Sequence, residues 1–270
     1  MLATLRVAVI QLRATLDVAA NLAQAERLVR EAAAGGAQLV VLPELFQAYG
    51  RLPEVIKLAE AIPGPTSTLL CALARECQIT LVGGSFGERT AHDPRGYNTS
   101  LLIDPAGEIM ARYRKLHLFD VDLPGQVTVK ESDSMLPGEE VVATSTRLGV
   151  IGQAICYDLR FPELFRALSQ RGAELICVPS AFTATTGRDH WEVLLRARAI
   201  ENQCYFLASN QYGEHAPGST SYGGSLIIDP WGEVLARGPL DRDAVLFAEL
   251  HEERIKQVRA RLPALQHRRM

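Results

Sequence analysis

The sequence predicts an α/β fold, a four-layer α-β-β-α sandwich with an internal pseudo-two-fold repeat. Apolar runs of strand length alternate with amphipathic runs of helical length, which is typical of helices packed on a mixed or parallel sheet. The second half of the chain repeats the pattern of the first. With 47% hydrophobic and 22% charged residues, the composition is that of a globular protein with a sizeable core. A length of 270 residues suits one large α/β domain, so we expect residues 1–270 to form a single domain.

The first half is expected to run strand, helix, strand, helix, strand and hairpin. These elements cover, in order, residues 5–12, 21–34, 38–42, 66–78, 79–83 and 97–113. Gly35 and Gly36 stop the first helix, as glycine commonly does at a helix C-terminus. The strand–helix–strand order is a βαβ unit, which predicts parallel strands covered by helices.

The second half contains two segments that match the first. Residues 172–179 (GAELICVP) match residues 36–43 (GAQLVVLP) at an offset of 136, and residues 226–233 (LIIDPWGE) match residues 101–108 (LLIDPAGE) at an offset of 125. Similarity at such long spacing indicates two copies of one layout of strands and helices. Each copy buries one face of its sheet under helices, so the other two faces are expected to pack together.

Cys156 lies where a buried strand ends and a helix begins. Residues 150–155 have the pattern of a short strand, and Pro162 suits the first turn of a helix that begins near Phe161. A cysteine on such a turn displays its sulfur beside backbone N–H groups, as a thiolate nucleophile requires. A small buried apolar residue is the alternative, and for this stretch alone it is the commoner case.

Two more polar residues follow apolar runs. Glu44 comes directly after the strand at 38–42, and apolar neighbours on both sides predict a half-buried carboxylate that can accept a thiol proton near neutral pH. A surface carboxylate is the alternative. Lys115 ends the first hairpin, where the second copy has Leu240, which indicates a specialised role. The alternative is one basic residue of a mixed run.

With Glu44, Lys115 and Cys156 in this order, the sequence resembles the nitrilase, or carbon–nitrogen hydrolase, superfamily over essentially its whole length. The resemblance implies an α-β-β-α sandwich. It also implies that Glu44 is the general base, Cys156 the nucleophile and Lys115 the stabiliser of the tetrahedral intermediate. Glu131 matches a second family glutamate that orients the lysine and the substrate, with an exposed loop carboxylate as the alternative. The backbone N–H of Tyr157 is expected to share the oxyanion with Lys115.

The stretch around the cysteine resembles the Nit branch of the superfamily, whose members act on 2-oxoglutaramyl amides. Two activities follow from this resemblance. One releases Cys-Gly and 2-oxoglutarate from deaminated glutathione, a repair reaction, and the other is the ω-amidase release of ammonia from 2-oxoglutaramate or 2-oxosuccinamate. Pro162, Ser180 and the tail at 261–269 resemble the branch members with the first activity more than those with the second, so the resemblance favours the first activity. A non-catalytic binding module with the same fold is a further alternative.

Arg160, four residues past the cysteine, is the candidate for binding the substrate carboxylate, because a guanidinium donates two parallel hydrogen bonds to it. A structural salt bridge to Asp158 or Glu163 is the alternative. Thr183 and Thr185 are candidates for binding the polar end of the substrate, or for capping a turn.

The proposed chemistry needs no metal or organic cofactor, and the six histidines show no paired-ligand spacing. A net charge of −3 argues against nucleic acid as a partner. No apolar run reaches transmembrane length, so we expect no membrane association. An odd number of cysteines, five, without C-x-x-C pairs, and an amino terminus without a signal peptide favour the cytoplasm.

Residues 189–203 are predicted to form a helix with Asp189 as its cap. The resemblance implies a homodimer or a larger even assembly built through helices near this one. The tail from about residue 250 is expected to pack at a subunit interface.

Overall fold

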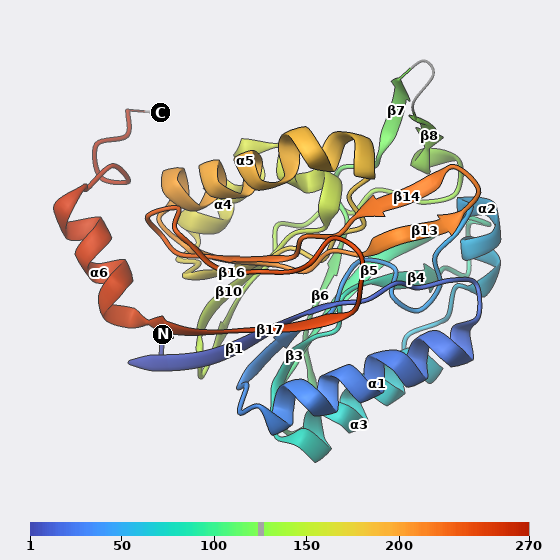
Figure 1. Cartoon of the computed structure of the whole chain (residues 1–270), viewed down its shortest axis with the longest axis horizontal. Coiled ribbons are helices and arrows are strands. Elements are labelled where there is room, and N and C mark those ends of the chain that lie inside the picture. Colours follow the sequence, from blue (N-terminus) through green and yellow to red (C-terminus); the bar gives the residue numbers. More distant parts are fainter. Residues whose placement is uncertain (124–126, 270) are drawn as a thin grey trace.

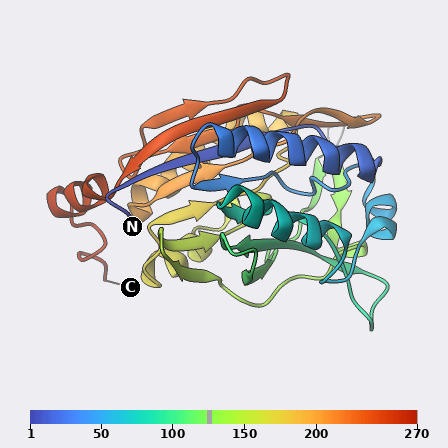
Figure 2. The ribbon, with the colours of Figure 1, turned by 90° about the horizontal axis from the view of Figure 1, so that it is seen from below.

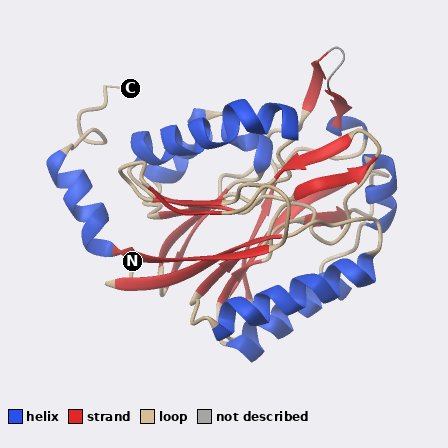
Figure 3. Cartoon of the chain, in the orientation of Figure 1, coloured by secondary structure: helices blue, strands red, loops and turns tan. Residues whose placement is uncertain are grey.

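The computed structural model describes residues 1–123 and 127–269, which form layers of helix, sheet, sheet and helix (Figure 1). The four covering helices are α1 (Val18–Ala34), α3 (Pro65–Cys77), α4 (Pro162–Gln170) and α5 (Ala184–Asn202). Helices α4 and α5 cover one outer face and α1 and α3 cover the other, with the strands between them (Figure 3). Seen from below, α1 and α3 lie side by side (Figure 2). The predicted α-β-β-α sandwich is confirmed.

Within the described residues, the larger sheet has seven strands and the smaller sheet has six. The larger sheet contains β1 (Thr4–Gln11), β2 (Leu39–Val41), β3 (Thr80–Val82), β4 (Phe86–Arg89), β5 (Gly96–Ile103), β6 (Ile109–Arg114) and β17 (Ala244–His251). The smaller sheet contains β9 (Ala143–Thr146), β10 (Gly149–Gln153), β11 (Leu175–Cys177), β12 (Tyr205–Ala208), β15 (Leu226–Ile228) and β16 (Val234–Arg237). The hydrogen-bonded orders are β17-β1-β2-β3-β5-β4, with β6 also on β5, and β16-β15-β12-β11-β10-β9.

The predicted repeat is visible in the pairing of the strands. In the larger sheet β1, β2 and β3 are parallel, and β5 and β6 follow as antiparallel strands. In the smaller sheet β10, β11 and β12 are parallel, and β15 and β16 follow in the same way. Gln78 and Gln203, 125 positions apart, both take a left-handed conformation, with φ of 55° and 51°, directly after α3 and α5.

The sheets pack against each other through side chains that alternate along their strands. In β1, Val7 and Val9 belong to the core between the sheets, whereas Ala8 and Ile10 belong to the core under α1 and α3. Both faces of β1 are therefore buried, which explains why its sequence is an almost unbroken apolar run.

Two helices begin earlier in the structure than the sequence predicts. Asp17 accepts a hydrogen bond from the N–H of Ala20 at 3.0 Å, so α1 begins three residues before the predicted start. The prediction that Asp189 caps the fifth helix was wrong, because α5 begins at Ala184 with Thr183 as its N-cap. The first turn of α5 lacks an apolar stripe and contains weak helix formers. The periodicity of apolar residues therefore gave no signal that the helix begins there.

Several short elements complete the chain. They are two hairpins, β7 (Asp120–Leu123) with β8 (Val127–Lys130) and β13 (Tyr212–Ala216) with β14 (Ser219–Tyr222), the helices α2 (Leu52–Val55) and α6 (Glu252–Arg261), and the 3-10 turns η1 (Ile56–Leu58), η2 (Glu131–Asp133) and η3 (Cys156–Arg160). Helix α6 follows β17 and projects beyond the sandwich, with Ile255 and Val258 buried (Figure 1). None of the described helices has the length and apolar character needed to cross a bilayer.

His215 fastens the β13–β14 hairpin to the rest of the fold. Its Nδ1 lies 2.8 Å from the Ala14 carbonyl oxygen and its Nε2 lies 2.9 Å from Ser221 Oγ. Its ring also meets the Tyr49 ring edge-on, with centroids 4.3 Å apart. Burial lowers the pKa of His215 to about 4, with the positive charge of Arg13 acting in the same direction. The folded protein therefore holds this imidazole neutral.

We expect His215 to make stability pH-dependent. The imidazole titrates near 6.5 when unfolded and near 4 when folded, so between these values the unfolded chain binds more protons. The free energy of unfolding should fall as pH drops through this window, by up to about 1.4 kcal/mol per pH unit. Urea unfolding at pH 7 and pH 5 measures the loss, which should shrink in His215→Gln and persist in His92→Gln, an exposed control. Equal losses in wild type and His215→Gln would contradict this account.

Candidate active site

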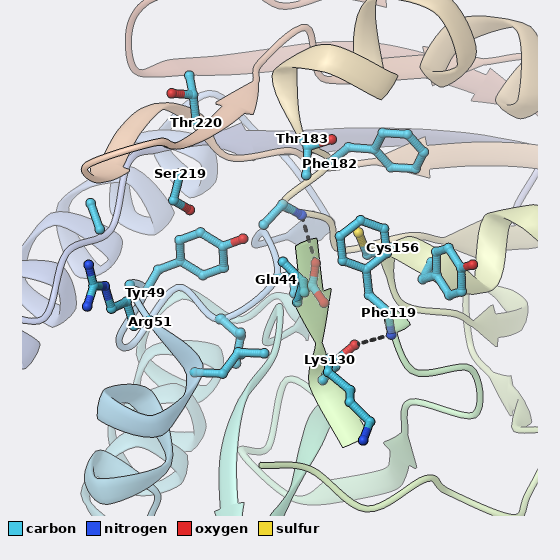
Figure 4. Close-up of a pocket in the computed structure, with 18 of the residues that line it drawn as sticks. Glu44, Tyr49, Arg51, Phe119, Lys130, Cys156, Phe182, Thr183, Ser219 and Thr220 are labelled. Carbon is cyan, nitrogen blue, oxygen red and sulfur yellow. Dashed lines mark hydrogen bonds between the residues drawn. The ribbon is translucent and has the colours of Figure 1, made fainter. Parts of the chain in front are cut away.

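A cavity of about 710 Å³ opens where strand ends of both sheets meet (Figure 4). All eight residues singled out from the sequence line it, four as catalytic candidates and four as substrate-binding candidates. They are Glu44, Lys115, Glu131 and Cys156, and Tyr157, Arg160, Thr183 and Thr185. The structure therefore brings together in one cavity residues that are far apart in the chain.

Cys156 is held on a sharp turn between β10 and α4. Its φ of 45° lies in the left-handed region, which costs a non-glycine residue of order 1–3 kcal/mol. The Cys156 N–H donates to the Pro179 carbonyl at 2.9 Å, and η3 then leads into α4, which begins with Pro162 as predicted. This turn places the thiol in the wall of the cavity, beside the first N–H groups of η3, which lack acceptors within their own turn.

Glu44 follows β2 and is more deeply buried than predicted, with 3% of the residue exposed. Its Oε1 accepts hydrogen bonds from Lys115 Nζ at 2.9 Å and from Asn98 Nδ2 at 2.8 Å. Its Oε2 accepts from the backbone N–H of Ala181 at 2.8 Å. These donors come from both halves of the chain and fix the carboxylate in one orientation.

Lys115 lies between two carboxylates and is 2% exposed. Its Nζ is 2.9 Å from Glu44 Oε1 and 2.9 Å from Glu131 Oε2. Burial alone would lower the pKa of Lys115, but the carboxylates of Glu131 and Glu44 outweigh it and raise that pKa well above its usual value. The ammonium therefore stays charged beside the cysteine.

Glu131 begins η2 and is buried, so the alternative of an exposed loop carboxylate was wrong. Its Oε2 accepts from the Phe119 N–H at 2.6 Å, and its Oε1 lies 3.4 Å from Asn98 Nδ2. Both oxygens also contact Lys115 Nζ, at 3.2 and 2.9 Å. Glu131 thus holds the ammonium together with Glu44.

Burial keeps the thiol of Cys156 protonated beside the negatively charged Glu44. Burial raises its pKa well above the usual value, and the negative charge of Glu44 raises it further, whereas Lys115 opposes the shift. A protonated thiol next to a carboxylate can pass its proton to that carboxylate as it attacks an electrophile.

Sequence reasoning missed two donors that organise this cluster. Asn98, buried in β5, contacts both glutamates, and the N–H of Ala181 holds Glu44. Asn98 could have been found from the sequence as a polar amide side chain within the predicted strand, which the structure shows to be buried along most of its length. No side-chain signal could reveal Ala181, because its contribution comes from the backbone.

Arg160 lines the cavity, and its guanidinium packs over the Phe182 ring at 5.1 Å. Its Nη1 lies 3.2 Å from His190 Nδ1. The alternative of a salt bridge from Arg160 to Asp158 or Glu163 was wrong. Among the described residues Arg160 forms no ion pair, and Asp158 pairs with His117 instead. The guanidinium is therefore free of carboxylate partners in the part of the chain that the structure describes.

The other end of the cavity is also cationic and polar. Arg51, Ser219 and Thr220 lie on the side of Tyr49 away from Cys156 (Figure 4). Within residues 1–123 and 127–269, the Arg51 guanidinium has no hydrogen bond or ion pair. The lining of the cavity thus includes two arginines, Arg160 over the ring of Phe182 and Arg51 beyond Tyr49.

The two threonines lie at the start of α5. Thr183 is the N-cap, and its Oγ1 lies 2.8 Å from Thr186 Oγ1, while Thr185 is in the first turn.

The described residues contain no group of three or more His, Cys, Asp or Glu side chains arranged to hold a metal ion. The five cysteines are free thiols.

Comparisons with known proteins agree with this architecture. Residues 6–260 match the family model of carbon-nitrogen hydrolases. The chain is 44% identical over 264 residues to deaminated glutathione amidase of Synechocystis sp. (strain PCC 6803 / GT-S), which covers 97% of each chain. It is 38% identical over 267 residues to omega-amidase NIT2 of Homo sapiens, which covers 98% of this chain and 95% of the relative.

Among solved structures, Saccharomyces cerevisiae Nit3, a member of branch 10 of the nitrilase superfamily, superposes with a TM-score of 0.90. The two sequences are 32% identical, and the match covers 99% of this chain and 97% of that one. The predicted resemblance is therefore confirmed, and the chain belongs to the carbon–nitrogen hydrolase family.

Proposed function

We propose that the chain is a cysteine-dependent amidase that hydrolyses the amide of a 2-oxoglutaramyl compound through a thioester. The observation that carries this proposal is the buried cluster of three groups in one cavity: the Cys156 thiol, the Glu44 carboxylate and the Lys115 ammonium, whose Nζ lies 2.9 Å from Glu44 Oε1. An amide is a poor electrophile, and covalent catalysis divides its hydrolysis into acylation and deacylation.

In acylation, Glu44 takes the thiol proton while Sγ of Cys156 attacks the amide carbon. The oxyanion that forms is stabilised by Lys115 Nζ and the Tyr157 N–H, and the loss of one such donor costs about 10²–10³ in rate. Glu44 then gives the proton to the leaving nitrogen, and the C–N bond breaks. The amine departs and the acyl group remains on sulfur as a thioester.

In deacylation, a water molecule takes the place of the amine. Glu44 accepts a proton from the water, whose oxygen attacks the thioester carbon, and the same two donors stabilise the second oxyanion. The C–S bond breaks, the acid leaves and the thiol regains its proton from Glu44. Glu131 keeps Lys115 charged and oriented through both steps.

For the substrate, we propose deaminated glutathione, with 2-oxoglutarate and Cys-Gly as products. This molecule has one carboxylate on its 2-oxo acid part and a second on its glycine. Two arginines in the lining of the cavity suit such a dianion, and we assign Arg160 to the 2-oxo acid and Arg51 to the glycine carboxylate. Thr183 and Thr185 are proposed to contact the polar end of the substrate. The similarity to the Synechocystis deaminated glutathione amidase supports the same assignment.

The alternative is an ω-amidase that acts on 2-oxoglutaramate or 2-oxosuccinamate, and the similarity to human omega-amidase NIT2 favours it. Both substrates share the 2-oxo acid end and the same catalytic residues. The ω-amides lack the second carboxylate, so they leave Arg51 without a partner.

We also propose a homodimer or larger even assembly in the cytoplasm, with the tail from about residue 250 at an interface. Exposed apolar side chains support an interface near α5, among them Val193, 66% exposed, and Trp231, 55% exposed.

The first test measures 2-oxoglutarate release from deaminated glutathione and from 2-oxoglutaramate side by side. We expect kcat/KM to favour the peptide by at least about 100-fold, roughly 3 kcal/mol of transition-state binding. Cys156→Ala should be inactive on both. A preference for the small amide would identify an ω-amidase, no turnover of any amide would favour a non-catalytic binding module, and activity in Cys156→Ala would overturn the mechanism.

A second test separates the two arginines. Arg160→Ala should lower kcat/KM for both substrates, whereas Arg51→Ala should lower it about tenfold or more for deaminated glutathione only, because a hydrogen bond to a charged group contributes about 1.5–3 kcal/mol. Arg242→Ala, at an exposed position outside the cavity, serves as the control. Equal effects of Arg51→Ala on both substrates would contradict the assignment of the glycine carboxylate.

A further inference from the structure

Asp158 is a fully buried carboxylate to which the proposed reaction gives no role. Its Oδ2 accepts hydrogen bonds from the Tyr113 hydroxyl at 2.6 Å and from the Ile155 N–H at 2.8 Å. Its Oδ1 accepts from the His117 N–H at 3.0 Å and lies 2.7 Å from Nδ1 of the same residue. Both oxygens of this carboxylate are therefore fully used by groups of the protein.

The positions of these donors in the chain are informative. Tyr113 and His117 flank Lys115, two residues before it and two residues after it, and Ile155 directly precedes Cys156. A single carboxylate thus joins the segment that carries the ammonium to the turn that carries the thiol. Tyr113, His117 and Asp158 are not among the described residues that line the cavity. Any effect of these side chains on the reaction must therefore pass through Lys115 or Cys156.

Both side-chain donors are fixed by their surroundings. Burial, together with the charge of Asp158, raises the pKa of Tyr113 well above its usual value, so the phenol keeps its proton and donates it. The His117 ring stacks on Phe161, with centroids 3.7 Å apart and an interplanar angle of 7°, which sets the edge that faces Asp158. Phe161 is the residue directly before α4, so the stack also ties the Lys115 segment to the helix that follows the cysteine turn.

We propose that Asp158, Tyr113 and His117 are positioning residues that set the location of the Lys115 ammonium relative to the Cys156 thiol. This inference rests on the roles proposed above for Lys115 and Cys156. It matters for rate because a displacement of about 1 Å between catalytic groups can cost about 10²-fold. The cluster performs this task with hydrogen bonds that a substrate never touches.

The experiment uses Tyr113→Phe, which deletes one hydroxyl and keeps the ring in the core. Tyr205→Phe is the matched control, because Tyr205 is also buried and its hydroxyl bonds to the backbone of His251, at the end of β17. His117→Phe is a second variant that keeps a ring to stack on Phe161. The readouts are the rate at which iodoacetamide alkylates Cys156, kcat and KM on deaminated glutathione, and the midpoint of urea unfolding.

We expect Tyr113→Phe to lower both the alkylation rate and kcat about tenfold or more, with KM changed less than twofold. Tyr113→Phe combined with His117→Phe should lower them at least about 100-fold. Tyr205→Phe should shift the unfolding midpoint by a similar amount while its alkylation rate and kcat stay within twofold of wild type. Wild-type rates in Tyr113→Phe, or equal losses in Tyr205→Phe, would overturn the proposal.

The alkylation readout separates this proposal from the proposed substrate. If wild type is alkylated at Cys156 but hydrolyses neither amide, the substrate assignment fails and the alkylation rates of the variants still decide the role of the cluster. If iodoacetamide does not modify the wild-type thiol, both proposals are overturned.

Discussion

The structure of the site depends on the pairing of one buried ammonium, Lys115, with two buried carboxylates, Glu44 and Glu131. Burial of three charges is costly, at several kcal/mol per ion, unless hydrogen bonds satisfy the remaining lone pairs. Asn98 and the N–H of Ala181 supply them to Glu44, and the Phe119 N–H supplies one to Glu131. The Ala181 N–H follows β11 of the smaller sheet, so the hydrogen bonds of Glu44 are complete only once both sheets are assembled.

The internal repeat explains how the fold holds the proposed general base. Glu44 ends β2, and the equivalent position in the second copy, 136 residues later, is Ser180 after β11. These two positions meet: the Glu44 N–H donates to the Ser180 carbonyl at 3.4 Å, and the next N–H, that of Ala181, holds Glu44 Oε2. Face-to-face packing of two similar sheets therefore brings equivalent strand ends together, with a carboxylate on one and backbone groups on the other.

The fold and the catalytic candidates could be predicted because both produce patterns in the amino-acid sequence. The repeat survives as similar segments. Glu44 and Cys156 each follow an apolar run at a strand end, and Lys115 ends the first hairpin. The depth of burial of Glu44 could not be read locally, since it comes from packing of the second sheet. The start of α5 was missed because its first turn has no apolar stripe. Asp158 was considered only as a partner for Arg160, whereas its actual donors lie up to 45 residues away.

The most direct test of this account compares the alkylation of Cys156 by iodoacetamide in wild type and in Glu44→Gln at pH 7. The thiol is buried with a raised pKa and is proposed to pass its proton to Glu44, so we expect an alkylation rate at least about 100-fold lower in Glu44→Gln, in the range of general-base effects. The two unfolded proteins should react equally in denaturant, which controls for reagent and concentration. Equal rates in the two folded proteins would contradict the central claim that Glu44 activates Cys156.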